Sequence, residues 1–183
     1  MATSRINDAD NAVLHGVLLE IAGAGVLLSG ASGIGKSETA LELISRGHRL
    51  VADDAPRFAL NTRGRLIGRC PGVLRNVLAV RALGVLDIAA LFGARAVAAE
   101  VSLDLIVRLE RGAADDAQAL HSPAPRPCSV LGVEIPELTL HLAPGRNTAL
   151  LVECLVRNYL LQQSGYDGAR AFVERQRRAL GAL

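Results

Sequence analysis

A glycine-rich segment near the start of the chain carries the residues best suited to chemistry. Residues 30–37 read Gly-Ala-Ser-Gly-Ile-Gly-Lys-Ser and match the pattern G-x-x-x-x-G-K-S/T in full. The glycines leave room for successive backbone N–H groups to turn towards phosphate oxygens. Lys36 can reach the β- and γ-phosphates of a nucleoside triphosphate, and the Ser37 hydroxyl can bind Mg²⁺. The predicted phosphate-binding residues are Gly30, Ala31, Ser32, Gly33, Ile34, Gly35, Lys36 and Ser37.

The segments on either side of this loop are the ones that a phosphate-binding loop requires. The apolar stretch Ala24–Ser29 predicts a buried strand before the loop. A helix is expected to begin at Lys36, because the apolar residues between positions 40 and 44 are spaced for one buried face. The positive end of its dipole would favour an anion. A glycine-rich turn without function is the alternative, but strand and helix together favour phosphate binding.

Two acidic residues follow the next predicted strand, His48–Ala52. An aspartate at the end of an apolar strand commonly orients magnesium in such proteins, which favours Asp53 as a metal ligand. Adjacent residues of a strand point to opposite faces, so Asp54 can join Asp53 only if the strand ends there and the chain turns. Asp54 could then accept a proton from an attacking hydroxyl. A capping or turn aspartate pair is the alternative.

His15 lies on a strand predicted over Ala12–Ile21. A two-residue turn after Ile21 would, counting back along both strands, place His15 opposite Gly30. There it could hydrogen-bond a carboxylate or a phosphate oxygen. A purely structural histidine remains the alternative.

Composition narrows the class of protein. With 183 residues the chain is expected to form one domain, residues 1–183, with residues 1–11 flexible. A net charge of +2 and 3% aromatic residues argue against nucleic acid or a membrane surface as partner. No uncharged run reaches the ~18 residues of a membrane span. Three cysteines, odd in number and far apart, fit neither a disulfide framework nor a C-x-x-C metal site. A cytoplasmic protein is expected.

The remaining sequence mixes strand and helix patterns and ends in two predicted C-terminal helices. The expected elements are a hairpin over Arg57–Arg69, two short helices within Val73–Phe92 broken near Gly84, a strand over Ser102–Glu110, a flexible loop over residues 111–128, a strand over Val130–Leu142, and helices over Thr148–Gln163 and Asp167–Leu180 with Asn147 and Asp167 as N-caps.

These motifs belong to a longer pattern. His15-Gly16-Val17, the loop Gly30–Ser37 and the stretch Glu38–Asp54 together closely resemble the catalytic domain of the HPr kinase/phosphorylase family. The similarity covers nearly the whole chain from about Asn11 and continues through Val80-Arg81, Leu83–Ile88, Leu91-Phe92-Gly93, Pro144–Asn147 and Arg157-Asn158.

The resemblance implies an ATP-dependent protein serine kinase that uses Mg²⁺. Its substrate would be HPr, the small phosphocarrier of the bacterial sugar phosphotransferase system, or a homologue. Many members also run the reverse reaction with inorganic phosphate and release pyrophosphate. The implied fold is α/β, a P-loop-containing mixed sheet with flanking helices like the nucleotide-binding part of phosphoenolpyruvate carboxykinase. The implied assembly is a hexamer.

The resemblance also assigns roles to individual residues. Asp54 matches the proton acceptor of the kinase direction and the donor of the reverse one. His15 and Lys36 match active-site positions, and Ser37 matches a magnesium ligand. Arg146 lies in the segment linked to dephosphorylation.

The chain departs from the family pattern in three places. Most members carry a separate N-terminal domain, whereas about ten residues precede the first predicted strand here, so regulation through that domain is expected to be absent or supplied elsewhere. Ala79 stands where the family has a magnesium-binding glutamate, and Asp116–Leu120 occupies the neighbourhood of an Asp-Arg-Leu-Gly motif.

These departures motivate a second hypothesis, a nucleotide-binding regulatory module that has lost most catalysis. A third, a kinase for a small hydroxylated molecule, fits the phosphate loop alone.

Overall fold

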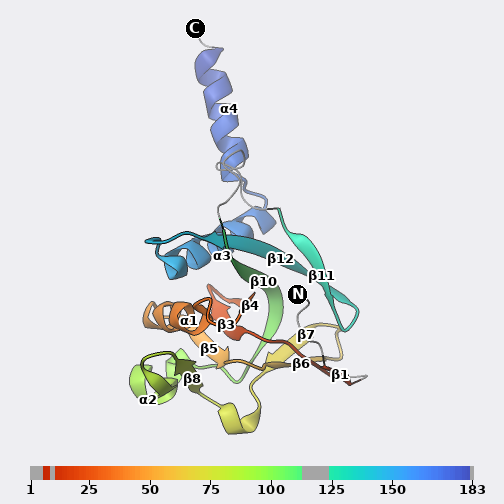
Figure 1. Ribbon diagram of the computed structural model, residues 1–183. Coiled ribbons are helices and arrows are strands. Elements are labelled where there is room, and N and C mark those ends of the chain that lie inside the picture. Colours follow the sequence, from red (N-terminus) through yellow and green to blue (C-terminus); the bar gives the residue numbers. More distant parts are fainter. Residues whose placement is uncertain (1–5, 9–10, 113–123, 182–183) are drawn as a thin grey trace.

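The computed structural model describes residues 6–8, 11–112 and 124–181 as a curved mixed sheet with helices packed against it (Figure 1). The strands are β1 (Ile6–Asp8), β2 (Asn11–Val13), β3 (Val17–Ile21), β4 (Ala24–Gly30), β5 (Arg49–Ala52), β6 (Arg57–Leu60), β7 (Leu66–Arg69), β8 (Val77–Val80), β9 (Gly84–Asp87), β10 (Glu100–Arg111), β11 (Arg126–Val130) and β12 (Val133–Leu142). The helices are α1 (Lys36–Ser45), α2 (Ile88–Phe92), α3 (Thr148–Gln163) and α4 (Gly168–Leu180), with 3₁₀ turns at Gly72–Leu74 and Ala94–Ala96.

Strand β10 joins the two parts of the sheet. Its first residues pair antiparallel with β7, which continues through β6 and β2 to β1. Its later residues pair parallel with β4 on one side and β12 on the other. Strand β3 is antiparallel to both β4 and β5. Strands β4, β5, β10 and β12 therefore run in the same direction, and the residues that follow them gather at one edge of the sheet.

Both faces of the sheet are buried, which explains why β4 is apolar along nearly its whole length. One face carries α1, α3 and residues of β8 and α2, in a cluster that includes Leu43, Leu78 and Val152. The other face closes around Phe58, which is fully buried. The loop that follows β4 is therefore supported from both sides.

Several elements match the sequence-based expectation. The β3–β4 hairpin pairs Ile21 with Ala24, and β6 and β7 form the expected hairpin around residues 61–64. Helix α3 has the expected bounds, and the side chain of its N-cap Asn147 accepts a hydrogen bond from the backbone N–H of Leu150 at 2.7 Å. Asp167 caps α4 in the same way.

The strand expected over Ala12–Ile21 is instead two strands, β2 and β3, with a bend between them. At the bend Gly16 packs directly on β4, and a Cβ atom there would overlap the backbone oxygen of Leu28. The backbone N–H of Gly16 donates a hydrogen bond to the backbone oxygen of Asp54 at 3.1 Å. His15 consequently precedes β3 and lies outside the hairpin register that would have set it opposite Gly30.

Of the two helices expected within Val73–Phe92, the first is absent and the second is present only over Ile88–Phe92. Strands β8 and β9 form a hairpin, and α2 begins only at Ile88. Leu78 and Val80 are buried while Ala79 between them is exposed, a period of two that outweighs the helix propensity of Leu and Ala.

The flexible loop expected over residues 111–128 ends earlier at its C-terminal side, because β11 begins at Arg126 and pairs with β12. Residues 113–123, including Asp116–Leu120, lie outside the described residues. At the other end of the chain, Ile6–Asp8 form β1 within the stretch expected to be flexible.

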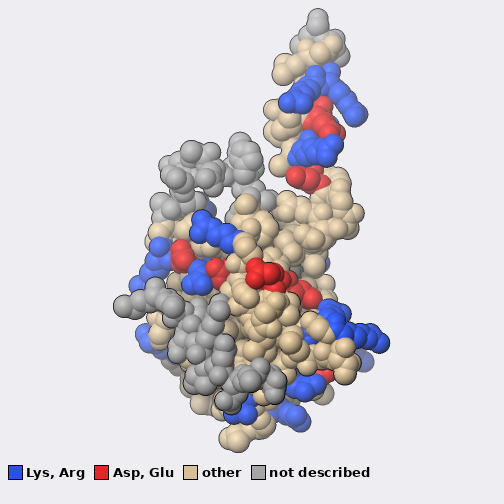
Figure 2. Space-filling view, turned by 90° about the vertical axis from the view of Figure 1, so that its right-hand side faces the viewer, with Lys and Arg blue, Asp and Glu red and all other residues tan. Residues whose placement is uncertain are grey.

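Helix α4 projects from the rest of the molecule (Figures 1 and 2). None of its described residues is buried, and basic side chains gather along it in Figure 2. Across the described residues, the structure contains no helix with the length and apolar character needed to cross a bilayer.

Candidate active site

The predicted phosphate loop connects β4 to α1 in an open glycine-rich turn. Gly33 and Gly35 have φ angles of 72° and 100°, in the left-handed region that residues with a Cβ rarely adopt. The Lys36 Nζ folds back over the loop and donates hydrogen bonds to the backbone oxygens of Gly30 at 3.0 Å and Ala31 at 3.1 Å. The loop thus presents backbone groups, a helix N-terminus and an ammonium group at one point.

A cavity of about 280 Å³ opens over this loop. It lies where the phosphate loop, the end of β5 and the β8–β9 hairpin meet. Its lining residues are Ser32, Gly33, Gly35, Lys36, Ser37, Glu38, Asp53, Asp54, Ala79 and Arg81. Most of the predicted loop residues and both predicted acids therefore line one cavity, while Ile34 packs against the hydrophobic core.

Asp53 and Asp54 reach the same cavity because β5 ends at Ala52 and the chain turns. Asp54 has a φ of 67°, in the left-handed region. The strand therefore ends and the chain turns at this point, which was the condition for Asp54 to lie on the same side as Asp53. Asp53 is only 9% exposed, and its Oδ2 accepts a hydrogen bond from the backbone N–H of Ala79 at 2.9 Å. Burial raises the pKa of Asp53, although that hydrogen bond opposes the shift. The Asp54 side chain is 83% exposed.

His15 lies beside Asp54, with 3.9 Å between His15 Nδ1 and Asp54 Oδ1. This proximity arises because the bend at Gly16 is hydrogen-bonded to the Asp54 backbone. His15 is outside the residues that line the cavity, so it contacts the site through Asp54. Arg146 lies outside them as well, in the exposed turn between β12 and α3.

Two arginines near the loop were not selected as site residues from the sequence. Arg81 lines the cavity, and a Cβ atom on Gly33 would lie 3.7 Å from its Nη2. Arg111 Nη2 donates to the backbone oxygen of Gly33 at 3.3 Å. Arg111 is the last residue of β10, and the shared direction of β4 and β10 is the signal that could have identified it.

The oxygen groups around the cavity suit a magnesium ion. Ser37 offers a hydroxyl, and Asp53 and Asp54 offer carboxylates, the hard donors that Mg²⁺ prefers. The described residues contain no cluster of three or more His, Cys, Asp or Glu side chains arranged to hold a metal. Because Mg²⁺ usually keeps several waters and binds one or two carboxylates together with substrate phosphates, the residues present fit the ion.

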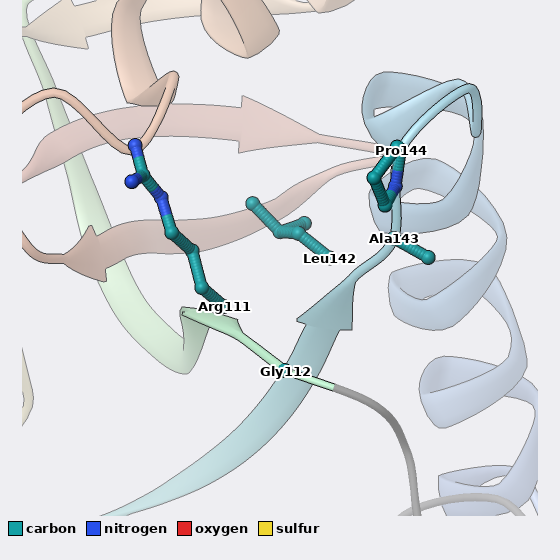
Figure 3. A pocket seen from close by; sticks show the side chains of 5 residues that line it. All are labelled: Arg111, Gly112, Leu142, Ala143 and Pro144. Carbon is teal, nitrogen blue, oxygen red and sulfur yellow. The ribbon is translucent and has the colours of Figure 1, made fainter.

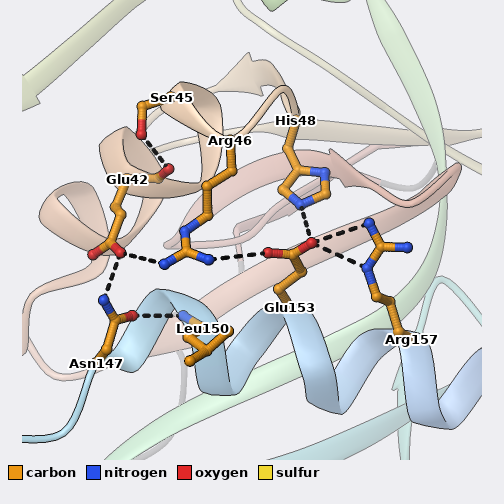
Figure 4. A network of polar contacts seen from close by, with 8 residues as sticks. All are labelled: Glu42, Ser45, Arg46, His48, Asn147, Leu150, Glu153 and Arg157. Atoms are coloured by element: carbon orange, nitrogen blue, oxygen red, sulfur yellow. Dashed lines mark hydrogen bonds and ion pairs between the residues drawn. The ribbon is translucent and has the colours of Figure 1, made fainter.

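A polar network fixes α1 against α3 (Figure 4). Asn147 Nδ2 donates to Glu42 Oε1 at 2.6 Å, and Arg46 donates to the same oxygen at 2.8 Å. These two hydrogen bonds lower the pKa of Glu42. Glu153 Oε2 lies 3.5 Å from Arg46 Nη1, and Glu153 Oε1 lies 3.5 Å from His48 Nε2. The network holds the helix that begins at the phosphate loop against the segment that follows β12.

Comparison with known proteins finds similarity over most of the chain. The sequence profile of the HPr serine kinase C-terminal domain matches residues 7–176. The HPr kinase/phosphorylases of Burkholderia cenocepacia (strain HI2424) and Burkholderia multivorans (strain ATCC 17616 / 249) are each 51% identical over 172 residues, which is 94% of this chain and 53% of theirs. The chain thus spans about half the length of these curated relatives.

A solved structure, that of the Hpr(Ser) kinase/phosphatase from Coxiella burnetii, is similar to the fold described above. The two agree with a TM-score of 0.77 and 36% sequence identity, over 87% of this chain and 97% of that chain. This similarity confirms the expected fold class, an α/β P-loop-containing mixed sheet with flanking helices of the phosphoenolpyruvate-carboxykinase-like type.

Asp53→Asn is expected to raise the free energy of unfolding at neutral pH. Burial makes the ionised carboxylate costly, while an amide oxygen can still accept the hydrogen bond from Ala79. The pKa of Asp53 is higher in the folded chain than in the unfolded one, so the contribution of Asp53 to wild-type stability falls as pH rises between those two values. Urea denaturation across a pH series measures this fall, which should shrink in the variant.

Asp54→Asn is the matched control, because the Asp54 side chain is largely exposed. It should keep most of this fall, because burial of Asp53 is the largest cause of its raised pKa and the charge of Asp54 is a smaller one. An Asp53→Asn variant less stable than wild type at neutral pH would contradict the account of a costly buried charge.

Proposed function

This chain belongs to the HPr serine kinase C-terminal domain family, and from that premise we propose that it transfers the γ-phosphoryl group of ATP to a serine of the phosphocarrier HPr or a homologue. The observation that carries the proposal is the meeting of Lys36, Ser37 and the Asp53-Asp54 pair around one cavity. Phosphoryl transfer needs positioning and neutralisation of charge more than covalent chemistry, and these groups supply both.

The phosphate loop binds and orients the triphosphate. Backbone N–H groups at the start of α1 face the phosphate oxygens, and Lys36 exchanges its hydrogen bonds with Gly30 and Ala31 for the β- and γ-phosphates. Ser37 and Asp53 would hold Mg²⁺, which when bound would neutralise negative charge on the phosphates. The guanidinium of Arg81 adds positive charge on the same side of the loop.

Asp54 acts as the base. It accepts the proton of the serine hydroxyl as the serine oxygen bonds to the γ-phosphorus, and the bond from that phosphorus to the β–γ bridging oxygen breaks and releases ADP. The exposed side chain of Asp54 can be reached by a protein substrate, whereas Asp53 is buried and hydrogen-bonded to Ala79. His15, 3.9 Å from Asp54, orients its carboxylate.

The reverse reaction and the assembly belong to the same proposal. Asp54 would give its proton to the serine oxygen as an oxygen of inorganic phosphate bonds to the phosphorus of phosphoserine and the bond from that phosphorus to the serine oxygen breaks, which forms pyrophosphate. Arg146, in the exposed turn that follows β12, would serve this direction. Assembly into a hexamer, and a cytoplasmic single-domain catalytic unit, remain predictions.

A second candidate function has one observation in its favour. Ala79 lies beside Asp53 on the wall of the cavity, where its side chain offers no oxygen to a metal. A module that binds nucleotide without rapid transfer would also satisfy the geometry.

The Asp54→Asn variant separates the two functions. With labelled ATP, Mg²⁺ and HPr, the wild type should label a serine of HPr, and the variant should do so about 10²–10⁴-fold more slowly because it lacks the base. Asparagine tolerates the φ of 67° at this position better than alanine does, so the fold is kept.

Asp87→Asn is the control, since asparagine can also accept the hydrogen bond from the N–H of Ala90 that caps α2. It should label HPr at the wild-type rate. Wild-type protein that binds ATP but labels no serine would favour the binding module, and an Asp54→Asn variant of full activity would remove Asp54 from the mechanism.

Ala79→Glu is expected to lower the Mg²⁺ concentration needed for half-maximal transfer by about tenfold, because the new carboxylate can bind the ion beside Asp53. Ala79→Gln matches it in size without the charge and should leave the requirement unchanged. Initial rates over a magnesium titration measure both. Identical titrations for wild type and Ala79→Glu would contradict the placement of the ion.

A further inference from the structure

We propose that a second cavity, next to the phosphate loop, receives the nucleobase of the bound triphosphate. The cavity has a volume of about 520 Å³ and is lined by Arg111, Gly112, Leu142, Ala143 and Pro144 (Figure 3). The proposal rests on the proposed function, in that it takes a nucleoside triphosphate as the ligand. It assigns a binding site to residues that the phosphate loop and the acids leave out.

The order of the strands decides on which side of the loop the nucleoside must lie. Across this edge the strands follow the order β12, β10, β4, β3 and β5, and all of them except β3 end there. The acids follow β5, the phosphate loop follows β4, and the second cavity lies at the ends of β10 and β12. A triphosphate carries its transferable phosphoryl group and its nucleoside at opposite ends. If Asp54 is at the transfer end, the nucleoside extends over β10 towards β12.

Arg111 links the second cavity to the phosphate loop. The sheet register pairs Leu109 with Gly30 and Arg111 with Leu142, so the end of β10 lies between the start of the loop and the end of β12. Arg111 donates to the backbone oxygen of Gly33, which itself lines the phosphate cavity. Figure 3 shows Arg111 reaching towards the loop, with Leu142 between it and Pro144.

The chemistry of the lining suits an aromatic base. Leu142, Ala143 and Pro144 offer apolar surface, and the Arg111 guanidinium can stack on a ring face. Among the described residues that line the cavity none is acidic, and Arg111 contributes a positive charge. The volume lies within the range of about 300–1,000 Å³ typical of small-molecule sites. An apolar side chain of the protein substrate is the competing occupant.

Comparing two ligands tests the proposal, namely ATP and inorganic tripolyphosphate, which has the phosphates but no base. Leu142→Ala and Pro144→Ala each remove apolar surface from the cavity wall. Calorimetric titration with Mg²⁺ present should show that each weakens ATP binding about five- to tenfold, with tripolyphosphate affinity within about twofold of wild type. Pro144 is exposed, so its variant keeps the fold even if Leu142→Ala is unstable.

Leu140→Ala is the matched control. Leu140 lies two residues earlier on β12 and is likewise partly buried against the same hydrophobic cluster, but it does not line the cavity. Its variant should bind both ligands as the wild type does. This comparison separates loss of contact with the nucleobase from loss of stability. Thermal unfolding of each variant measures the stability.

Three outcomes would overturn the proposal. ATP affinity could be unchanged in both cavity variants, ATP could bind no tighter than tripolyphosphate to the wild type, or the variants could raise only the KM for the carrier protein. The last result would assign the cavity to the protein substrate. Serine labelling tests the proposed function separately, since the cavity variants can fail to weaken ATP binding while the wild type still labels HPr.

Discussion

The shared direction of β4, β5, β10 and β12 is the constraint on which the rest of the structure depends. Because these strands end at one edge of the sheet, the loop after β4, the acids after β5 and the last residue of β10 gather there. Arg111 contacts Gly33 at this edge although 78 positions separate them in the sequence. Burial of both faces fixes the strands, and the network between Glu42 and Asn147 fixes α1 above them. A phosphate site built from backbone groups needs this rigidity, since its N–H groups must be aimed before the ligand arrives.

Two neighbouring aspartates receive different environments from one turn. Asp53 is buried and hydrogen-bonded to Ala79, whereas Asp54 enters the left-handed region and points its carboxylate to solvent beside His15. In the proposed mechanism the buried acid would hold the metal, and the exposed acid would accept the proton of an incoming hydroxyl. The difference in environment between the two aspartates arises because β5 ends at Ala52 and the chain turns there.

The sequence predicted the local parts of the site and missed those that depend on contacts between distant segments. The glycine-rich loop after β4 and the start of α1 follow from short patterns, whereas the turn that brings Asp53 and Asp54 to one cavity was a condition that the sequence left open. The position of His15 did not follow from a short pattern, because the bend at Gly16 exists only where β4 leaves no room for a Cβ atom. The β8–β9 hairpin was missed for a similar reason: its Leu- and Ala-rich sequence also suits a helix, and burial of Leu78 against the sheet decides between them. The position of Arg111 beside the loop depends on the pairing of β10 with β4, and no local sequence pattern reveals that pairing.

The structure of the chain bound to Mg²⁺ and a non-hydrolysable ATP analogue tests the central claim most directly. The account predicts that Lys36 Nζ leaves the backbone oxygens of Gly30 and Ala31 and hydrogen-bonds the β- and γ-phosphates, with the γ-phosphate on the side of Asp54. A triphosphate bound away from the loop, or bound at the loop with its γ-phosphate on the β12 side, would contradict it.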